Sequence, residues 1–291
     1  MITLDKDECI GRIIRTKTHF GLDQVKQATE FIPAINRDWV PFHFIDVGAN
    51  IGTHIVAALL GAGFREATAF EPVPELFKVL QENIKINDLG GRSALFNLAL
   101  SGKRAALQIE LSPHNMGDNR IIKSNRVSRH HEELWEKTTI TAITLDSITK
   151  LKNGQLNFMP VPNRSAPPDQ SELPGALNSD KRPLQPFTSA ALDKNNTLVW
   201  IDTQGHEPDV FKGAKKLLKS KIPFVSEFWP YGITRAGFSF QGYWKYFKQR
   251  SVYRLSENPQ LYTKQEALDF FNSALKIESE SYSPHLDLLI I

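Results

Sequence analysis

The chain has 291 residues, of which 41% are hydrophobic and 10% aromatic, so it can bury a substantial core. Its formal net charge of +3 is too small to indicate nucleic acid, and we expect no nucleic-acid partner. A single cysteine, Cys9, excludes an internal disulfide, and no run approaches the roughly 20 apolar residues of a membrane-spanning helix. The first residues lack a basic region followed by an apolar run, so no signal peptide and a cytoplasmic location are expected.

Residues 1–41 are expected to form a helical or irregular segment, and residues 42–291 one larger α/β domain. From residue 42 onward, short apolar runs alternate with stretches of helical periodicity. The expected elements are strands at 42–47, 67–70 and 94–100 and helices at 51–60 and 74–86. This alternation predicts a doubly wound, mostly parallel sheet with helices on both faces. Right-handed crossovers then place the ligand crevice at the carboxyl ends of the strands.

The middle of the chain is less regular. Residues 105–111 and 138–143 are predicted to form an inserted hairpin, and 144–148 a short helix. Residues from about 152 to 196 hold seven of the chain's 17 prolines and few periodic apolar positions, which is typical of a long loop insertion. The elements expected after it are strands at 197–201, 222–226 and 286–291 and helices at 207–218, 238–250 and 265–275.

A glycine turn follows the first strand. Residues 44–52 read Phe-Ile-Asp-Val-Gly-Ala-Asn-Ile-Gly, and Glu71 closes the next strand 23 residues after Gly48. Glycines let a turn adopt unusual dihedral angles and let a ligand approach the backbone. A carboxylate at the tip of the second strand is where the ribose hydroxyls of a nucleotide-like ligand are held. The pair therefore predicts an adenosine-bearing cofactor.

The turn favours S-adenosylmethionine over a dinucleotide, because Ala49 and Asn50 stand where the dinucleotide pattern requires x-Gly. Asp46 is a candidate partner for the ammonium group of that cofactor, and the amides after Gly52 for its carboxylate. The turn residues Gly48, Asn50 and Gly52 are accordingly assigned to the cofactor site together with Asp46 and Glu71. The competing interpretations are an NAD-dependent oxidoreductase and a merely structural turn with a surface carboxylate.

A second group of polar residues follows the fourth core strand, where the reactive end of the cofactor is expected. It comprises Asp202, His206 and Glu207, and Glu227 ends the next strand. A strand-tip acid and a nearby histidine suit removal of a proton from a hydroxyl, so these four are the candidate catalytic residues, and Asp202 is also a candidate cofactor contact. The alternatives are that Asp202 and Glu207 only stabilise the next helix start and that His206 is a turn residue.

The same four side chains could together hold a divalent cation, although no spacing is a ligand signature and no residue is assigned to a metal. A basic cluster at 120–131 offers a site for an anionic, phosphorylated or nucleotide-linked substrate. Because Glu132, Glu133 and Glu136 follow directly, a solvated, self-compensating helix face is the favoured interpretation.

With these motifs, the chain resembles the FkbM family of S-adenosylmethionine-dependent methyltransferases over residues 42–229, the insertion excepted. The matching pieces are residues 44–52, Phe70-Glu71-Pro72 with Phe77 and Asn83, residues 97–101, Thr144-Leu-Asp146, residues 201–207 with Val210, Gly213 and Ala214, and Glu227 after Pro223. The resemblance implies a Rossmann-like class I methyltransferase fold of seven strands, the last one antiparallel. It also implies Asp46, Gly48 and Glu71 as cofactor contacts and places Asn97 near the adenine.

By the same resemblance, the expected reaction is O-methylation of a hydroxyl on a sugar or small secondary metabolite. The chain departs from the family in its long insertion and in Thr203-Gln204-Gly205, where the family often has Val-Glu-Gly. Gln204 thus removes a carboxylate beside the expected reaction site. An N- or C-methyltransferase of small molecules and a cofactor-binding but inactive partner protein stay open, as do the catalytic base and the oligomeric state.

Overall fold

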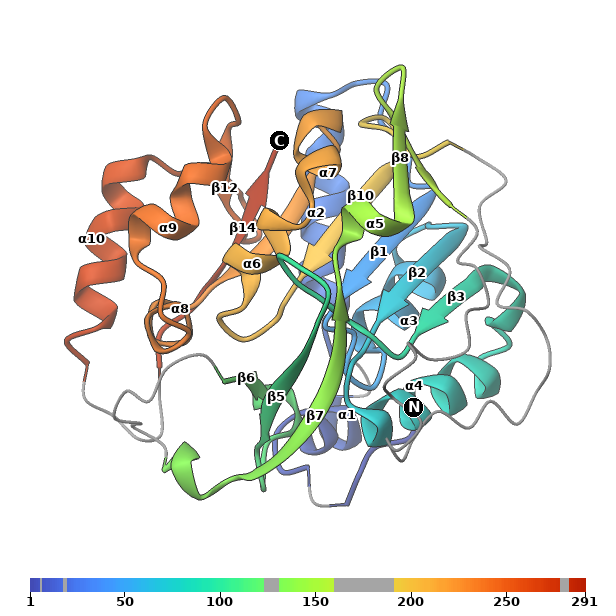
Figure 1. The fold of residues 1–291 in the computed structure, drawn as a ribbon. Coiled ribbons are helices and arrows are strands. Elements are labelled where there is room, and N and C mark those ends of the chain that lie inside the picture. The colour runs from blue at the N-terminus through green and yellow to red at the C-terminus, as the bar shows by residue number, and fades with distance from the viewer. Residues whose placement is uncertain (6, 18–19, 123–130, 160–190, 278–282) are drawn as a thin grey trace.

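The structure is a computed structural model that describes residues 1–5, 7–17, 20–122, 131–159, 191–277 and 283–291 (Figure 1). An eight-stranded sheet forms its centre. In spatial order the strands are β3 (Ser93–Phe96), β2 (Glu66–Phe70), β1 (His43–Val47), β10 (Thr197–Ile201), β11 (Phe224–Phe228), β14 (Leu286–Ile290), β12 (Val252–Arg254) and β13 (Gln260–Leu261).

The five strands from β3 to β11 are parallel, and β14 pairs antiparallel with both β11 and β12. The order third, second, first, fourth, fifth is that of a doubly wound Rossmann-like sheet, and the reversed last strand confirms the expectation. The predicted number of seven strands is wrong by one. The additional strand is β13, which extends the edge through the pairs Tyr253 with Leu261 and Arg254 with Gln260.

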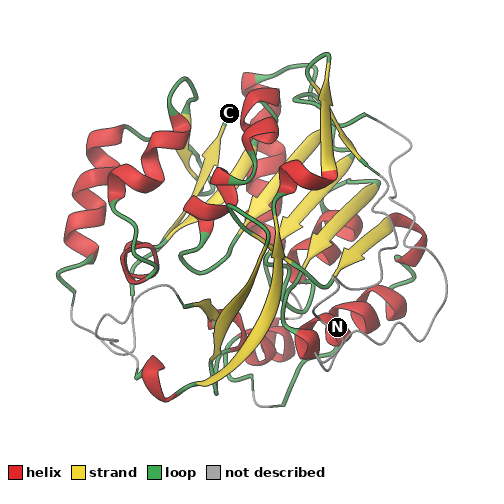
Figure 2. Cartoon of the chain, in the orientation of Figure 1, coloured by secondary structure: helices red, strands yellow, loops and turns green. Residues whose placement is uncertain are grey.

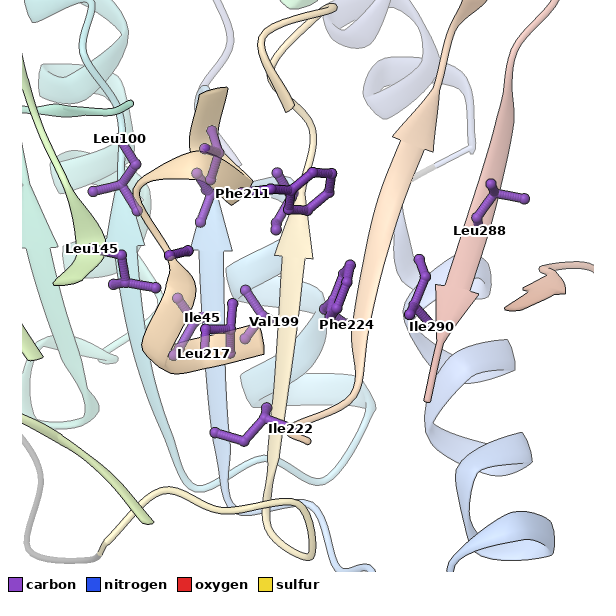
Figure 3. Packing of buried hydrophobic residues seen from close by; sticks show 14 of the residues in the cluster. Ile45, Leu100, Leu145, Val199, Phe211, Leu217, Ile222, Phe224, Leu288 and Ile290 are labelled. Atoms are coloured by element: carbon purple, nitrogen blue, oxygen red, sulfur yellow. The ribbon is translucent and has the colours of Figure 1, made fainter. Parts of the chain in front are cut away.

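Helices cover both faces of this sheet (Figure 2). On one face lie α2 (Leu22–Ile35), α3 (Thr53–Gly61) and α4 (Pro74–Ile86). The other face is covered by α5 (Leu145–Ile148), α6 (Glu207–Lys212), α7 (Lys215–Ser220), α8 (Pro230–Arg235), α9 (Phe240–Trp244) and α10 (Lys264–Ala274). Figure 3 shows Phe211 and Leu217 of this second layer packed over Val199 at the centre of the sheet. Strands buried on both faces explain the continuous apolar runs of the sequence.

A second sheet lies across the carboxyl ends of the main strands. It contains β4 (Ala99–Leu100), β7 (Glu136–Ile143), β5 (Ala105–Leu111) and β6 (Arg120–Ile121), in this order. The predicted hairpin is confirmed, because β5 and β7 pair antiparallel along seven residues. Its apolar face packs on α1 (Ile10–Lys17) and on the first turn of α4, so the N-terminal segment and the hairpin together cover this edge.

The expected strand at 94–100 is broken at Asn97, and its two halves, β3 and β4, belong to different sheets. The Asn97 side chain donates hydrogen bonds to the carbonyl groups of Glu71 and Pro72, 2.8 and 3.1 Å away, which turns the chain out of the main sheet. The expected helix at 207–218 is likewise divided at Gly213. A Cβ atom on Gly213 would lie 2.0 Å from the carbonyl oxygen of Ser101, so the helix bends where it packs against that strand end.

Three further differences concern the second half of the chain. The helix predicted at 238–250 is shorter in the structure: α9 ends at Trp244 and is followed by the 3-10 turn Lys245–Phe247 and then by β12. The sequence does not predict α8. Within the expected loop insertion, β9 (Gln155–Phe158) pairs with β8 (Thr149–Lys152), and Leu192 bridges to Leu156. Residues 160–190 of the insertion lie outside the described residues. No helix in the described ranges has the length and apolarity needed to cross a membrane.

Candidate functional site

The glycine turn joins β1 to α3 at the carboxyl edge of the sheet. Gly48 has φ 88°, and a Cβ atom there would lie 1.9 Å from the carbonyl oxygen of Asp202, so only glycine fits between the two strand ends. Gly52 has φ 91° and faces Leu80 of α4 at a similarly close distance. The turn is therefore packed closely against its neighbours, with Asp202 beside it.

Glu71 lies directly behind the turn. It is 4% exposed, and its two carboxylate oxygens accept hydrogen bonds from the backbone amides of Asn50 at 2.8 Å and Val73 at 2.7 Å. Burial raises the pKa of Glu71 to about 7, although both amides favour the charged form. The structure thus brings together the two features that the sequence singled out as a cofactor site.

Asn50 and Asn97 hold the loops around the turn. The Asn50 side chain donates to the carbonyl of Met116 at 2.7 Å and accepts from the amide of Ile51, with its own backbone at φ 52°. Asn50 therefore connects the turn to the 3-10 turn Met116–Asp118. The Asn97 side chain holds the backbone of Glu71, and its place near the adenine stays a prediction.

Asp46 is fully buried, in register with Ala69 of β2 and Trp200 of β10. Neither of its oxygens meets hydrogen-bond geometry with a described residue. Burial and the nearby Asp202 raise its pKa well above the ordinary value, and the amide of Ile55 offsets part of that effect. Asp46 lines neither cavity described below, so its predicted contact with an ammonium group stays a prediction that needs movement of the turn.

Asp202 and Glu227 lie side by side, joined by Gln204. The Gln204 side-chain nitrogen donates to Asp202 Oδ1 at 2.7 Å and to Glu227 Oε2 at 3.1 Å. Burial, followed by the charge of Asp202, raises the pKa of Glu227 well above its ordinary value. Burial also raises the pKa of Asp202, an effect reduced by its hydrogen bonds to Gln204 and to the Glu227 carboxyl.

The other two predicted catalytic residues point elsewhere. Glu207 is fully buried, and its Oε1 accepts from the Thr203 amide and hydroxyl at 2.8 and 2.9 Å and from the Gly205 amide at 3.2 Å. It therefore braces the loop that carries Gln204. His206 is 1% exposed, with Nε2 3.0 Å from the Ser101 hydroxyl and 4.0 Å from the Asp209 carboxylate. His206 thus faces the end of β4 and not the acid pair.

Two cavities meet at the turn, sharing Gly48, Asn50, Gly117, Asp202 and Gln204. The first, which we call the apolar cavity, has a volume of about 60 Å³. Its further walls include Phe70, Glu71, Pro72, Leu98, Met116 and His206. The second, the polar cavity, has a volume of about 440 Å³. Its further walls include His54, Asp118, Arg120, Glu227, Trp229 and His285.

Arg120, at the wall of the polar cavity, is a residue whose environment the sequence did not reveal. Its guanidinium group is buried between the rings of Trp135, Trp229 and Tyr231, with centroids 5.0, 4.6 and 5.7 Å away. It forms ion pairs with Asp118 and Glu132. The sequence predicts a solvated helix face for Arg120 and Glu132. This prediction is wrong for both, because Arg120 is 3% exposed and Glu132 has no exposed surface. Residues 123–130 of the basic cluster lie outside the described residues.

The cation hypothesis gains no support from this geometry. Among the residues that the structure describes, no three His, Cys, Asp or Glu side chains converge as metal ligands. Asp202 and Glu227 are adjacent, but Glu207 and His206 are turned to the loop and to Ser101.

No family profile and no curated protein matches the sequence of the chain. Among solved structures, the methyltransferase FkbM from Methylobacillus flagellatus is 11% identical with a TM-score of 0.42, covering 97% of this chain and 60% of that one. The chain thus spans 60% of the length of that neighbour.

Two further solved structures are similar at the same level. A SAM-dependent O-methyltransferase from Thermotoga maritima is 9% identical with a TM-score of 0.33, covering 97% of this chain and 70% of that one. An S-adenosylmethionine-dependent methyltransferase from Clostridium acetobutylicum is 9% identical, TM-score 0.33, covering 96% and 94%. At these values the likeness decides neither activity nor ligand, and the fold assignment rests on the strand order of the chain itself.

Proposed function

We propose that the chain is an S-adenosylmethionine-dependent methyltransferase that methylates a hydroxyl group of a sugar or small secondary metabolite. The observation that carries the proposal is the meeting of the two cavities at a glycine turn. One cavity is apolar with Glu71 at its rim, and the other is polar with Asp202 and Glu227 in its wall. S-adenosylmethionine matches this pair of cavities, because its nucleoside end suits the apolar one and its charged amino acid end suits the polar one.

The residues fit that cofactor in the nature of their donors and acceptors. Glu71 would accept from the ribose hydroxyls, with Phe70, Pro72 and Leu98 as apolar walls for the base. The apolar cavity has room for only a few waters, so binding of the cofactor requires its walls to move apart. When bound, the cofactor supplies an electrophilic methyl group. The acid pair lies where an acceptor hydroxyl in the polar cavity would be oriented and deprotonated.

The first test is calorimetric titration of the purified protein with S-adenosylmethionine, S-adenosylhomocysteine and NADH. We expect micromolar binding of the two sulfur compounds and none of NADH, followed by methyl transfer to a member of a panel of free sugars and small polyols. Binding of NADH alone would identify an oxidoreductase instead. Binding of the sulfur compounds without methyl transfer to oxygen, nitrogen or carbon acceptors would favour the inactive partner protein.

A further inference from the structure

Gln204 occupies an unusual position at the junction of the two cavities. It is a non-glycine residue at φ 54°, in a loop whose next residue, Gly205, packs on the backbone of Gly232. Left-handed backbone is costly for side-chain-bearing residues and persists only where surrounding contacts enforce it. Here the enforcing contacts are the three hydrogen bonds from Thr203 and Gly205 to Glu207. The loop is thus held in the conformation that aims Gln204 between Asp202 and Glu227.

The partners of Gln204 determine which way its amide group faces. A carboxyl oxygen that carries no proton only accepts hydrogen bonds, so the amide nitrogen, with its two hydrogens, is the atom that faces Asp202 Oδ1 and Glu227 Oε2. One hydrogen is directed to Asp202 and the other to Glu227, at 2.7 and 3.1 Å. An ionised glutamate at this position would have no such hydrogens and would add a further negative charge to the pair.

Two buried carboxyl groups bridged by a single amide nitrogen cannot both be ionised without a large cost, so we infer that they share one proton. Glu227 is the more buried of the two, at 7% exposed, whereas Asp202 is half-buried and lines both cavities. The proton therefore resides mainly on Glu227 and the negative charge on Asp202. The other titratable or charged groups around the pair are Asp46, Asp118, Glu207, Tyr243, His285 and Asp287, with His54 and Arg120 in the cavity wall.

We propose that Gln204 is a positioning residue that clasps Asp202 and Glu227 as a carboxyl pair sharing one proton, so that Asp202 serves as the base for the acceptor hydroxyl. This inference rests on the proposed function. In the transfer, an oxygen lone pair of the acceptor forms the new C–O bond, and the S–C bond breaks with its electron pair remaining on sulfur. The hydroxyl proton passes to Asp202, which leaves both members of the pair neutral until solvent removes one proton.

The first arm of the test uses the unliganded protein. Thermal unfolding midpoints are measured from about pH 5 to pH 9 for wild type, Gln204→Glu and Gln155→Glu, which adds the same charge at an exposed position of β9. We expect Gln204→Glu to match wild type near pH 5, where the added carboxyl is protonated. Near pH 8 its midpoint should lie about 3–8 °C below wild type, a gap that Gln155→Glu does not show. Parallel curves for Gln204→Glu and wild type would overturn the clasp.

The second arm uses Gln204→Met, which keeps the length of the side chain and removes both donors. We expect its affinity for S-adenosylhomocysteine to stay within about threefold of wild type, while kcat with the acceptor found in the sugar and polyol panel falls about 10- to 100-fold. The acid limb of its pH–rate profile should move to higher pH, because the charged form of Asp202 has lost a donor. Unchanged kcat and an unchanged profile would overturn the positioning role.

The two arms separate failure of the inference from failure of the proposed function. If wild type does not bind S-adenosylhomocysteine, the methyltransferase proposal fails, and with it the role of Asp202 as the base. The thermal arm still decides whether Gln204 clasps the pair, because it needs neither cofactor nor acceptor.

Discussion

At the scale of single residues, Glu71 lies where the sequence predicts it, beside the glycine turn at the end of the second strand. Its two oxygens already hold the amides of Asn50 and Val73, so it shapes the turn and also presents a carboxylate to the apolar cavity. Substitutions can separate the hydrogen bonds within the turn from the carboxylate that faces the cavity, because glutamine keeps the shape of the side chain and alanine does not.

We expect Glu71→Ala to weaken binding of S-adenosylhomocysteine by about 10- to 100-fold, since a hydrogen bond to a charged group contributes about 1.5–3 kcal/mol. It should also destabilise the fold by about 1–3 kcal/mol, because the amides of Asn50 and Val73 lose their acceptor. Glu71→Gln should show the smaller stability loss. Glu82→Ala, at an exposed position of α4, is the control for both measurements. Undiminished affinity in a folded Glu71→Ala protein would remove the ribose assignment.

The sequence located the strand tips well because carboxyl ends of parallel strands converge on one edge, which brings Glu71, Asp202 and Glu227 to one region. It could not decide where each side chain points. Asp46 shares the sheet face of Trp200, under α3, because of strand alternation and register. Glu207 turns back to its own loop. The sequence shows Gln204 only as the absence of a carboxylate. Its two hydrogen bonds depend on a left-handed backbone conformation that no local sequence pattern predicts.

At the scale of elements, a buried ionic network connects the hairpin sheet to α8. Glu132, just before β7, accepts from Tyr231 at 2.7 Å and pairs with both Arg120 and Arg235. Arg235 also pairs with Glu110 of β5. The network therefore fixes the hairpin, and with it Arg120 and Asp118, at the wall of the polar cavity.

Removing one partner of such a network leaves buried charges uncompensated, which is why we expect Glu132→Ala to destabilise the protein by about 3–5 kcal/mol. The adjacent Glu133 is exposed, and Glu133→Ala is expected to cost less than about 1 kcal/mol. Urea unfolding of the two variants measures the difference. Equal losses would mean that the hairpin is held by its apolar contacts with α1 and α4 alone.

The sequence predicted the hairpin from its two apolar runs, yet it misjudged the segment between them. Arg120 and Glu132 looked like solvated residues because the aromatic rings that cover Arg120 and the cations that pair with Glu132 come largely from residues 229–235, far along the chain. Composition within a window cannot reveal such a partner. The split of the expected third strand at Asn97 has the same origin, since the carbonyl groups that bind it belong to the preceding strand end.

At the scale of the whole molecule, buried carboxyl groups gather at the carboxyl edge of the sheet. Burial raises the pKa of Glu71, Glu207 and Asp287 to about 7, and those of Asp46 and Glu227 well above their ordinary values. These buried acids lower the free energy of unfolding at neutral pH, which is expected where carboxyl groups serve in binding and proton transfer. Two buried histidines act in the opposite direction, because burial lowers the pKa of His43 to about 3 and of His54 to about 4.

The signs of these shifts predict how stability depends on pH. A carboxyl with a raised pKa binds its proton more tightly when folded, so its contribution is present at low pH and is lost as pH rises through the folded value. The neutral histidines favour the folded state increasingly as pH rises from about 4 to about 6.5, which offsets the carboxyls in that window. Above about pH 6.5 the histidine contribution levels off within about one pH unit, whereas the carboxyls continue to titrate. We therefore expect the free energy of unfolding to fall by roughly 2–4 kcal/mol from pH 6.5 to pH 8.

Urea unfolding of the unliganded protein at closely spaced pH values measures this fall. Asp46→Asn and Glu227→Gln each remove one of the most strongly shifted groups, so the slope above pH 6.5 should become shallower in both variants. Glu82→Gln, which alters an exposed carboxyl on α4, should leave the slope unchanged. A free energy of unfolding that stays constant or rises across this interval would mean that the acids at the sheet edge are already ionised at pH 6.5. Their carboxyl groups would then be hydrated, although the structure shows them buried.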